Sequence, residues 1–235
     1  MKPKRHTRES SGTVTNLGVI FDWDGVVVDS SALHVQSWDQ LSREEGKTLP
    51  KGLKIGSLGV KTEYVITHLA GWTRDPAEVA RIALRKEDIF REMVAAGGLD
   101  PQPGVVHFMQ GLRALNIPCA VGSSAPRQNI EVGMDALGIR ELVQAVATGD
   151  DVEHGKPAPD IFLKAAERLG HEPEHCVVFE DAPAGVEAAR AAGMFVVGVL
   201  SAYSKERLGN ADHLIKTFEE LTTSDLLSWF EVRRA

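Results

Sequence analysis

Two aspartates separated by one residue, Asp22 and Asp24, follow directly after the apolar run 17–21 and precede Gly25. An apolar run of this length is typical of a buried strand. Burial of an unpaired carboxylate is costly, so we expect the two acids to lie where the strand leaves the core. Carboxylates are ligands that Mg²⁺ takes in proteins, usually together with phosphate oxygens. The pair therefore indicates a magnesium site, although a strand that simply ends in a polar turn would give the same pattern.

Further polar residues occupy corresponding places, each after a predicted strand. They are, in chain order, Ser123 and Ser124, then Lys156, then Glu180 and Asp181. Taken singly, a serine can cap a helix and a lysine can lie on the surface. Because the carboxyl ends of parallel strands meet at one edge of a sheet, we expect these side chains to gather there. Acids gathered in this way repel one another unless cations neutralise them, and a lysine with Mg²⁺ would do so.

The elements that must position these residues follow from the periodicity of the chain. After Gly104, strands alternate with helices of about ten residues, a pattern typical of an α/β protein with a parallel sheet. The strands are predicted at 17–21, 118–122, 142–147, 176–179, 195–200 and 213–215, and the helices at 105–115, 126–137, 157–169, 185–192 and up to 232. Residues 31–103 contain only helices, predicted at 31–46, 62–70 and 75–97, with a loop at 53–59 and a linker at 100–104. We therefore predict a core of residues 17–30 and 104–235, an all-helical cap inserted at 31–103, and a disordered tail at 1–16.

Composition limits the function classes that the chain can serve. The 235 residues carry a formal net charge of −7, so there is no basic surface typical of nucleic-acid binding. No apolar run reaches the roughly 18 residues of a membrane span, and the first 16 residues have no signal-peptide pattern. Cys119 and Cys176 lie in apolar stretches and are expected to be buried thiols rather than a disulfide or a metal pair. We expect a cytoplasmic protein, a monomer or weak dimer, with no nucleic-acid or membrane partner.

The four groups in this order resemble the motifs of the haloacid dehalogenase superfamily of phosphotransferases. The match runs through Asp22-x-Asp24-Gly25, Ser123, Lys156 before a proline, and Glu180-Asp181. The helical insertion resembles that of the subgroup that contains β-phosphoglucomutase and small phosphosugar phosphatases. The resemblance implies a Rossmann-like core with a helical cap, a small phosphorylated metabolite as the substrate and Mg²⁺ as the cofactor.

Roles follow from the resemblance for the matching positions. It implies that Asp22 is a nucleophile that becomes an aspartyl-phosphate, and that Asp24 is the general acid and base and also a metal ligand through its main-chain carbonyl. Phosphate binding falls to Ser123, Ser124 and Lys156. The metal set is Asp22, Asp24, Glu180 and Asp181. The implied reaction is Mg²⁺-dependent hydrolysis of a small phosphate monoester, with a sugar phosphate as the first choice.

The cap carries the residues that would choose the substrate. His34 and Trp38 match the start of the mutase cap, and Lys61 and Lys86 are candidates for contact with the substrate. A solvated helix face explains His34 and Lys86 equally well. Thr62 replaces a phosphate-reading arginine of the mutase, and Ala125 replaces a second serine. A phosphatase is therefore preferred, a phosphosugar mutase is the alternative, and a non-catalytic protein that binds a phosphorylated metabolite is a third hypothesis.

Overall fold

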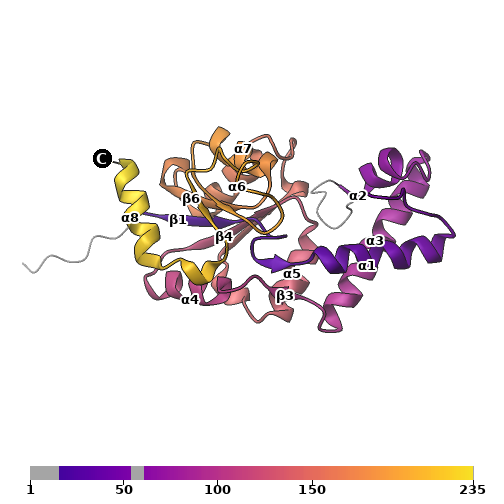
Figure 1. The fold of residues 1–235 in the computed structure, drawn as a ribbon, viewed down its shortest axis with the longest axis horizontal. Helices are drawn as coiled ribbons and strands as arrows, with labels where there is room; N and C mark the ends of the chain where they lie inside the picture. Colours follow the sequence, from indigo (N-terminus) through magenta and orange to yellow (C-terminus); the bar gives the residue numbers. More distant parts are fainter. Residues whose placement is uncertain (1–15, 54–60, 235) are drawn as a thin grey trace, which may run out of the picture.

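The computed structural model describes residues 16–53 and 61–234, and a six-stranded parallel sheet forms the centre of this part (Figure 1). The predicted tail, except for Asn16, and most of the predicted loop 53–59 lie outside the described residues. The strands are β1 (Gly18–Phe21), β4 (Cys119–Ser123), β5 (Ala145–Thr148), β6 (Cys176–Glu180), β7 (Phe195–Val199) and β8 (His213–Ile215). Their order in the sheet is β5-β4-β1-β6-β7-β8. The strand before the first acid pair is therefore flanked by β4, which ends at Ser123, and by β6, which ends at Glu180, while the segment with Lys156 follows β5 at the edge of the sheet.

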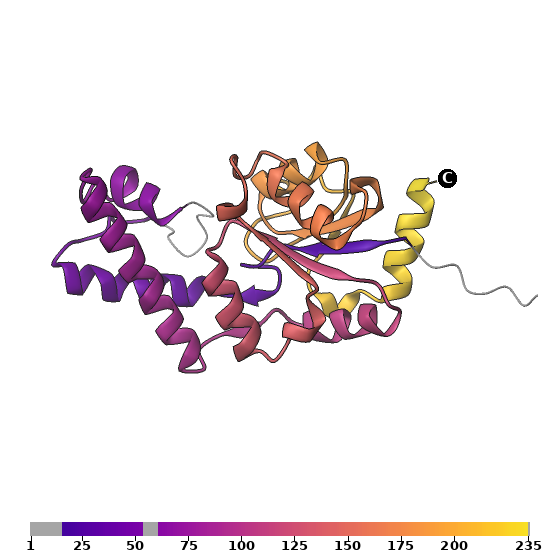
Figure 2. The ribbon, with the colours of Figure 1, turned by 180° about the vertical axis from the view of Figure 1, so that it is seen from behind.

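Helices cover both faces of this sheet, as Figure 2 shows from behind. Alternate residues of each strand point to opposite faces, so Phe21 packs with α4, α5 and α8 while Ile20 packs with α6 and α7. The helices are α4 (Val105–Ala114), α5 (Arg127–Ala136), α6 (Asp160–Leu169), α7 (Pro183–Ala191) and α8 (Thr223–Arg234). Short 3₁₀ segments connect them: η3 (Arg140–Leu142), η4 (Gly149–Asp151), η5 (Pro173–His175) and η6 (Phe218–Glu220). This Rossmann-like α/β arrangement confirms the predicted fold class.

The cap consists of α1 (Ser31–Glu45), α2 (Thr62–Tyr64), the π-helix η2 (Val65–Leu69) and α3 (Pro76–Ala95). Asp75 caps α3, where its Oδ1 accepts from the Ala77 N–H at 3.2 Å, and Pro76 occupies the first helical position. The cap has a hydrophobic cluster of its own, formed mainly by Trp38, Leu41, Val65, Ile66, Val79, Ile82, Ala83 and Ile89. Figure 1 shows the cap beyond the carboxyl end of β1. It therefore stands over the edge of the sheet where the predicted site residues emerge.

A short antiparallel ribbon joins the cap to the core. It is formed by β2 (Val28–Asp29) and β3 (Asp100–Pro101), with Val28 opposite Pro101 and Asp29 opposite Asp100. The sequence predicts only a linker at 100–104, because two-residue strands are too short to show a period. The segments that enter and leave the cap are thus paired side by side.

The predicted strands and helices of the core are present, and the differences are the β2–β3 ribbon, a π-helix in the cap and several boundaries. Residues 62–70 form one α-turn followed by a π-helix rather than a single α-helix. The predicted strand 142–147 begins later, at Ala145, and α6 begins at Asp160 rather than at Pro157. Over residues 16–53 and 61–234, no helix has both the length and the apolar character that crossing a membrane requires.

Candidate active site

The first acid pair lies on a tight turn that follows β1. The Asp22 N–H donates to the Phe179 carbonyl at 2.9 Å, which extends the pairing with β6 by one residue. The chain then reverses at Gly25, whose φ of 81° is a backbone conformation that residues with a side chain rarely adopt. A Cβ at Gly25 would also lie 2.0 Å from Asp181 Oδ2. Only glycine therefore lets the turn approach the acid that follows β6.

Lys156 joins two of the acids. Its Nζ donates to Asp22 Oδ1 at 2.7 Å and to Glu180 Oε2 at 2.8 Å, and it lies 4.7 Å from the centre of the Phe162 ring. Although burial opposes the charged form, these carboxylates raise the pKa of Lys156 above its ordinary value. The lysine is therefore a fixed positive charge beside the carboxylate of Asp22.

Glu180 is held from several sides. Its Oε1 accepts from the N–H groups of Asp181 and Ala182, at 3.1 and 3.0 Å. A Cβ at Gly185, in the first turn of α7, would lie 1.9 Å from Glu180 Oε2. The absence of a side chain at Gly185 therefore leaves the space that the carboxylate fills, and Glu180 in turn holds Lys156.

Three carboxylates meet at this edge of the sheet. Asp22, Glu180 and Asp181 each offer an oxygen, and these three oxygens lie within 4.8 Å of one another. Burial first, and then the charge of Glu180, raise the pKa of Asp22 to about 7, despite the opposing effect of Lys156. The same causes, together with Asp22, raise the pKa of Asp181 to about 8. Such a buried cluster has more negative charge than Lys156 alone can compensate, so its donor set fits a hard divalent cation.

Ser201 contacts the cluster from the loop after β7. Its Oγ donates to Asp181 Oδ2 at 3.0 Å. Ser201 is not among the predicted site residues, because these come from the ends of only four strands. Ser201 lies two residues beyond Val199, at the end of a further strand, so the same rule could have found it.

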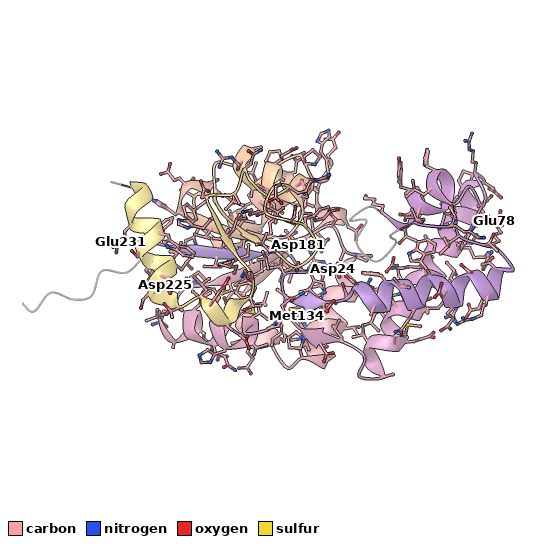
Figure 3. All side chains as sticks on the ribbon, in the orientation of Figure 1. Asp24, Glu78, Met134, Asp181, Asp225 and Glu231 are labelled. Atoms are coloured by element: carbon pink, nitrogen blue, oxygen red, sulfur yellow. The ribbon has the colours of Figure 1, made fainter. Side chains whose placement is uncertain are left out.

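Asp24 faces the cap rather than the acid cluster. Its Oδ1 accepts from Ser30 Oγ at 2.5 Å and lies 3.4 Å from His34 Nε2. Burial would raise the pKa of Asp24, but the contacts with His34 and Ser30 and the charge of Lys86 hold it below the ordinary value. Figure 3 shows Asp24 and Asp181 close together between the sheet and the cap. Asp22 and Asp24 therefore have opposite electrostatic environments although only one residue separates them.

His34 and Lys86 form the cap's contact with Asp24. The Lys86 Nζ lies 3.0 Å from His34 Nδ1, and the Phe90 ring stacks on the His34 ring at 4.5 Å. An ammonium group can only donate, so Nδ1 is the acceptor and the ring proton is on Nε2, directed at Asp24. Lys86 is 3% exposed, which excludes the solvated helix face as an explanation.

The remaining predicted residues occupy different surroundings. Ser123 is buried, and its Oγ accepts from the Ala125 N–H at 3.1 Å, while Ser124 beside it is half-buried. Lys61 is exposed, with its Cε 3.9 Å from the position of a Cβ on Gly149. Its stem thus extends from the cap toward the core near Ser124.

Trp38 is the predicted cap residue that lies apart from this group. It is 3% exposed, belongs to the hydrophobic cluster of the cap and packs edge-on against Trp72 at 5.7 Å. Its position gives it a packing role in the cap.

Comparison with known proteins agrees with this geometry. The family model of the haloacid dehalogenase-like hydrolases matches residues 17–193. The chain is 36% identical over 212 residues to the chloroplastic 5-amino-6-(5-phospho-D-ribitylamino)uracil phosphatase of Arabidopsis thaliana. The matched region covers 89% of this chain but only 57% of that relative. It is 35% identical over 184 residues to fructose-1-phosphate phosphatase of Escherichia coli (strain K12), covering 77% of this chain and 95% of the relative.

Solved structures share the fold. β-Phosphoglucomutase from Clostridium difficile superposes with a TM-score of 0.80 at 24% identity, covering 92% of this chain and 97% of that one. The match of the family model runs from the residue before β1 to just beyond α7. The chain therefore belongs to the haloacid dehalogenase-like hydrolases, and its named phosphatase relatives make it a phosphoric monoester hydrolase of that family.

Proposed function

We propose that the protein hydrolyses a small phosphate monoester, of the sugar phosphate class, with Mg²⁺ as cofactor and Asp22 as the group that is phosphorylated. The observation that carries the proposal is the position of Asp22, which contacts Lys156 at 2.7 Å and shares an acid cluster with Glu180 and Asp181. A carboxylate is a weak nucleophile, and it needs nearby positive charge to approach a phosphate dianion. Lys156 supplies one such charge from the chain itself.

In the first half of the reaction, an oxygen of Asp22 forms a bond to phosphorus as the ester P–O bond breaks. The charge of the bound phosphate ester opposes the contacts that lower the pKa of Asp24, so Asp24 takes up a proton as the substrate binds and then gives it to the leaving alkoxide. The contacts from Ser30 and His34 stabilise the Asp24 carboxylate that remains. General acid catalysis of this kind contributes about 10²–10⁴ in rate.

In the second half, water attacks phosphorus while the Asp24 carboxylate takes its proton. The bond between Asp22 and phosphorus breaks, inorganic phosphate leaves, and both aspartates return to their starting forms. Lys156, Ser123 and the main-chain N–H groups near the start of α5 are placed to hold the oxygens of the phosphoryl group.

The cation would be held by Asp22, Asp181 and the main-chain carbonyl of Asp24, with Glu180 beside them. When bound, Mg²⁺ neutralises the carboxylates and polarises the phosphoryl group. Burial first, and then repulsion between the acids, raise the pKa values of Asp22 and Asp181, and a bound cation would offset both costs.

Phosphate release from a panel of sugar and glycolytic monophosphates, with Mg²⁺ and with EDTA, tests the proposal. We expect turnover that EDTA abolishes, and loss of turnover in Asp22→Asn with an unchanged circular dichroism spectrum. A variant that keeps appreciable activity would refute the role of Asp22. The control is Asp135→Asn, an exposed residue of α5 that pairs with Arg140 away from the acids.

A phosphosugar mutase is the second candidate, because His34 of the cap contacts Asp24 and is itself contacted by Lys86. Incubation with β-glucose 1-phosphate and a sugar bisphosphate primer separates the two. Isomer formation without phosphate release would overturn hydrolysis as the main reaction.

A further inference from the structure

One asparagine of the core contacts two residues of the cap. Asn129 is the third residue of α5 and is 3% exposed. Its Nδ2 donates to Glu87 Oε2 at 2.6 Å, and its Oδ1 accepts from Arg91 Nη1 at 2.8 Å. Glu87 and Arg91 lie one turn apart on α3. Both ends of the amide are therefore satisfied by the same face of one cap helix, and only one orientation of the amide allows this.

Glu87 connects this contact to the rest of the cap. Its Oε1 accepts from Thr62 Oγ1 at 2.6 Å, at the start of α2. The Lys86 Nζ lies 3.2 and 3.3 Å from its two carboxylate oxygens. Lys86 in turn donates to His34, which faces Asp24. A continuous series of polar contacts thus runs from α5 of the core, through α3, to Asp24.

We propose that Asn129 is a positioning residue that fixes one docked orientation of the cap and thereby sets Lys86 and His34 against Asp24. The proposal rests on the proposed function, because the reaction is what this orientation serves. The three residues Asn129, Glu87 and Arg91 are called the clasp below.

The hydrogen bonds of the clasp favour one orientation of the cap more than they strengthen its contact with the core. When the cap moves away, water can bind each of its polar groups, so the net gain from the closed contact is modest. A mismatched contact is costly in this buried setting, because a donor facing a donor, or an acceptor facing an acceptor, remains unsatisfied. Because α5 begins shortly after Ser123 and Ser124, the helix next to the proposed phosphate-binding segment is also the helix that contacts α3 of the cap.

A polarity swap tests the clasp. Asn129→Asp places a carboxylate against the Glu87 carboxylate with no donor between them, whereas in Glu87→Gln the amide oxygen can still accept from Asn129. The double variant restores one hydrogen bond with donor and acceptor exchanged, because the new glutamine can donate to the new aspartate. A hydrogen bond to a charged group corresponds to about a ten- to hundredfold change in an equilibrium.

We therefore expect kcat/KM to fall at least tenfold in Asn129→Asp, to change less in Glu87→Gln, and to recover by at least tenfold in the double variant over Asn129→Asp. Asp135→Asn on the same helix is the matched control, and we expect it to retain wild-type kcat/KM. Wild-type kcat/KM in Asn129→Asp, or a double variant whose loss equals the product of the single losses, would overturn the proposal.

Hydrogen exchange provides a readout that does not depend on turnover. We expect amides of 127–131 and of α3 to exchange faster in Asn129→Asp and to regain protection in the double variant. If no phosphate ester is hydrolysed, this arm still tests the clasp, so its failure is distinguishable from failure of the proposed function. If Asn129→Asp does not fold, Asn129→Ala replaces it, and exchange at wild-type rates in Asn129→Ala overturns the clasp.

Discussion

Lys156 illustrates how one side chain can serve both the stability and the reactivity of the site. It is the charged partner of Asp22 and of Glu180, and all three are at most 10% exposed. Buried ion pairs of this kind contribute little net stability, but removal of one partner leaves a charge without compensation. In the proposed reaction, the same ammonium that contacts the two acids would stabilise charge on the transferring phosphoryl group.

Replacement of Lys156 by methionine should therefore destabilise the metal-free protein. In EDTA at pH 8 we expect the free energy of unfolding to fall by about 3 kcal/mol, because Asp22 and Glu180 lose their counter-charge. Urea denaturation measures this change. The loss should be smaller in Lys156→Met/Glu180→Gln, which removes one acid as well. Equal losses in the single and double variants would contradict the role of charge.

Substitution of Ser201 perturbs the same acid cluster less than loss of Lys156, because it changes no charge. Removal of its hydroxyl by Ser201→Ala takes away the hydrogen bond that orients Asp181. We expect the Mg²⁺ dissociation constant, measured by isothermal titration calorimetry, to rise about tenfold, since residues that orient metal ligands commonly contribute this much. Ser204→Ala, in the same exposed loop, is the control and should bind Mg²⁺ like the wild type.

The candidate site is predictable from the sequence to the extent that each residue lies at the end of an apolar strand. Asp22 and Asp181 satisfy this rule, and the parallel sheet brings them together, whereas Lys156 lies beyond η4 and depends on the loop that follows β5. Asn129 does not satisfy the rule either, because its role depends on how a cap helix lies against a core helix, and no pattern within α5 reports that contact. The burial of Lys86 cannot be predicted from the sequence for the same reason.

At the scale of elements, the tightest packing in the site lies between β6 and α7. The carboxylate of Glu180 occupies the space that a side chain at Gly185 would need, because a Cβ at Gly185 would lie 1.9 Å from Glu180 Oε2. The start of α7 therefore controls where Glu180, and through it Lys156, is held.

Gly185→Ala should displace Glu180 and lower kcat by at least tenfold, because Lys156 loses one of the two contacts that position it. The matched control is Gly155→Ala, next to Lys156, where a Cβ would have nothing within 4 Å and φ is not positive. The control should keep its activity and gain up to about 1 kcal/mol of stability from reduced freedom of the unfolded chain. Equal kcat values for the two variants would refute the packing argument.

Strands and helices of the core are predictable because their periods repeat over many residues. The ribbon of β2 and β3 is not, because four residues in two separate segments carry no period. The predicted helix begins at Pro157, because prolines fit the first turn of a helix. In the structure α6 begins at Asp160, directly after Pro159. Boundaries depend on local turns, whereas element types depend on repeated burial.

For the whole molecule, the acid cluster couples stability to both pH and metal. A carboxyl group whose pKa is higher in the folded protein than in the unfolded chain stabilises the fold in its protonated form. Asp22 and Asp181 have pKa values of about 7 and about 8, against 3.8 as the ordinary value. Their contribution is therefore complete below about pH 4 and is lost as the pH rises through 7 to 8.

Mg²⁺ should reverse this loss, because it binds the carboxylates after their protons have left. We expect the increase in Tm on addition of Mg²⁺ to grow from pH 5 to pH 8, and the metal-free Tm to fall over the same range. Differential scanning fluorimetry at a series of pH values measures both. In Asp181→Asn the increase should be smaller and less dependent on pH. An increase that is largest at pH 5 would contradict the assignment of the metal site.

The ribbon that joins cap and core has a consequence for how such an enzyme diversifies. Since Asp29 and Asp100 are direct partners, the polypeptide leaves the catalytic body and returns to it at neighbouring points. A different helical module of any length could be spliced between those points without altering the sheet that makes and breaks phosphorus–oxygen bonds. The proposed reaction would still involve both parts, because His34 of the inserted module contacts Asp24 of the core.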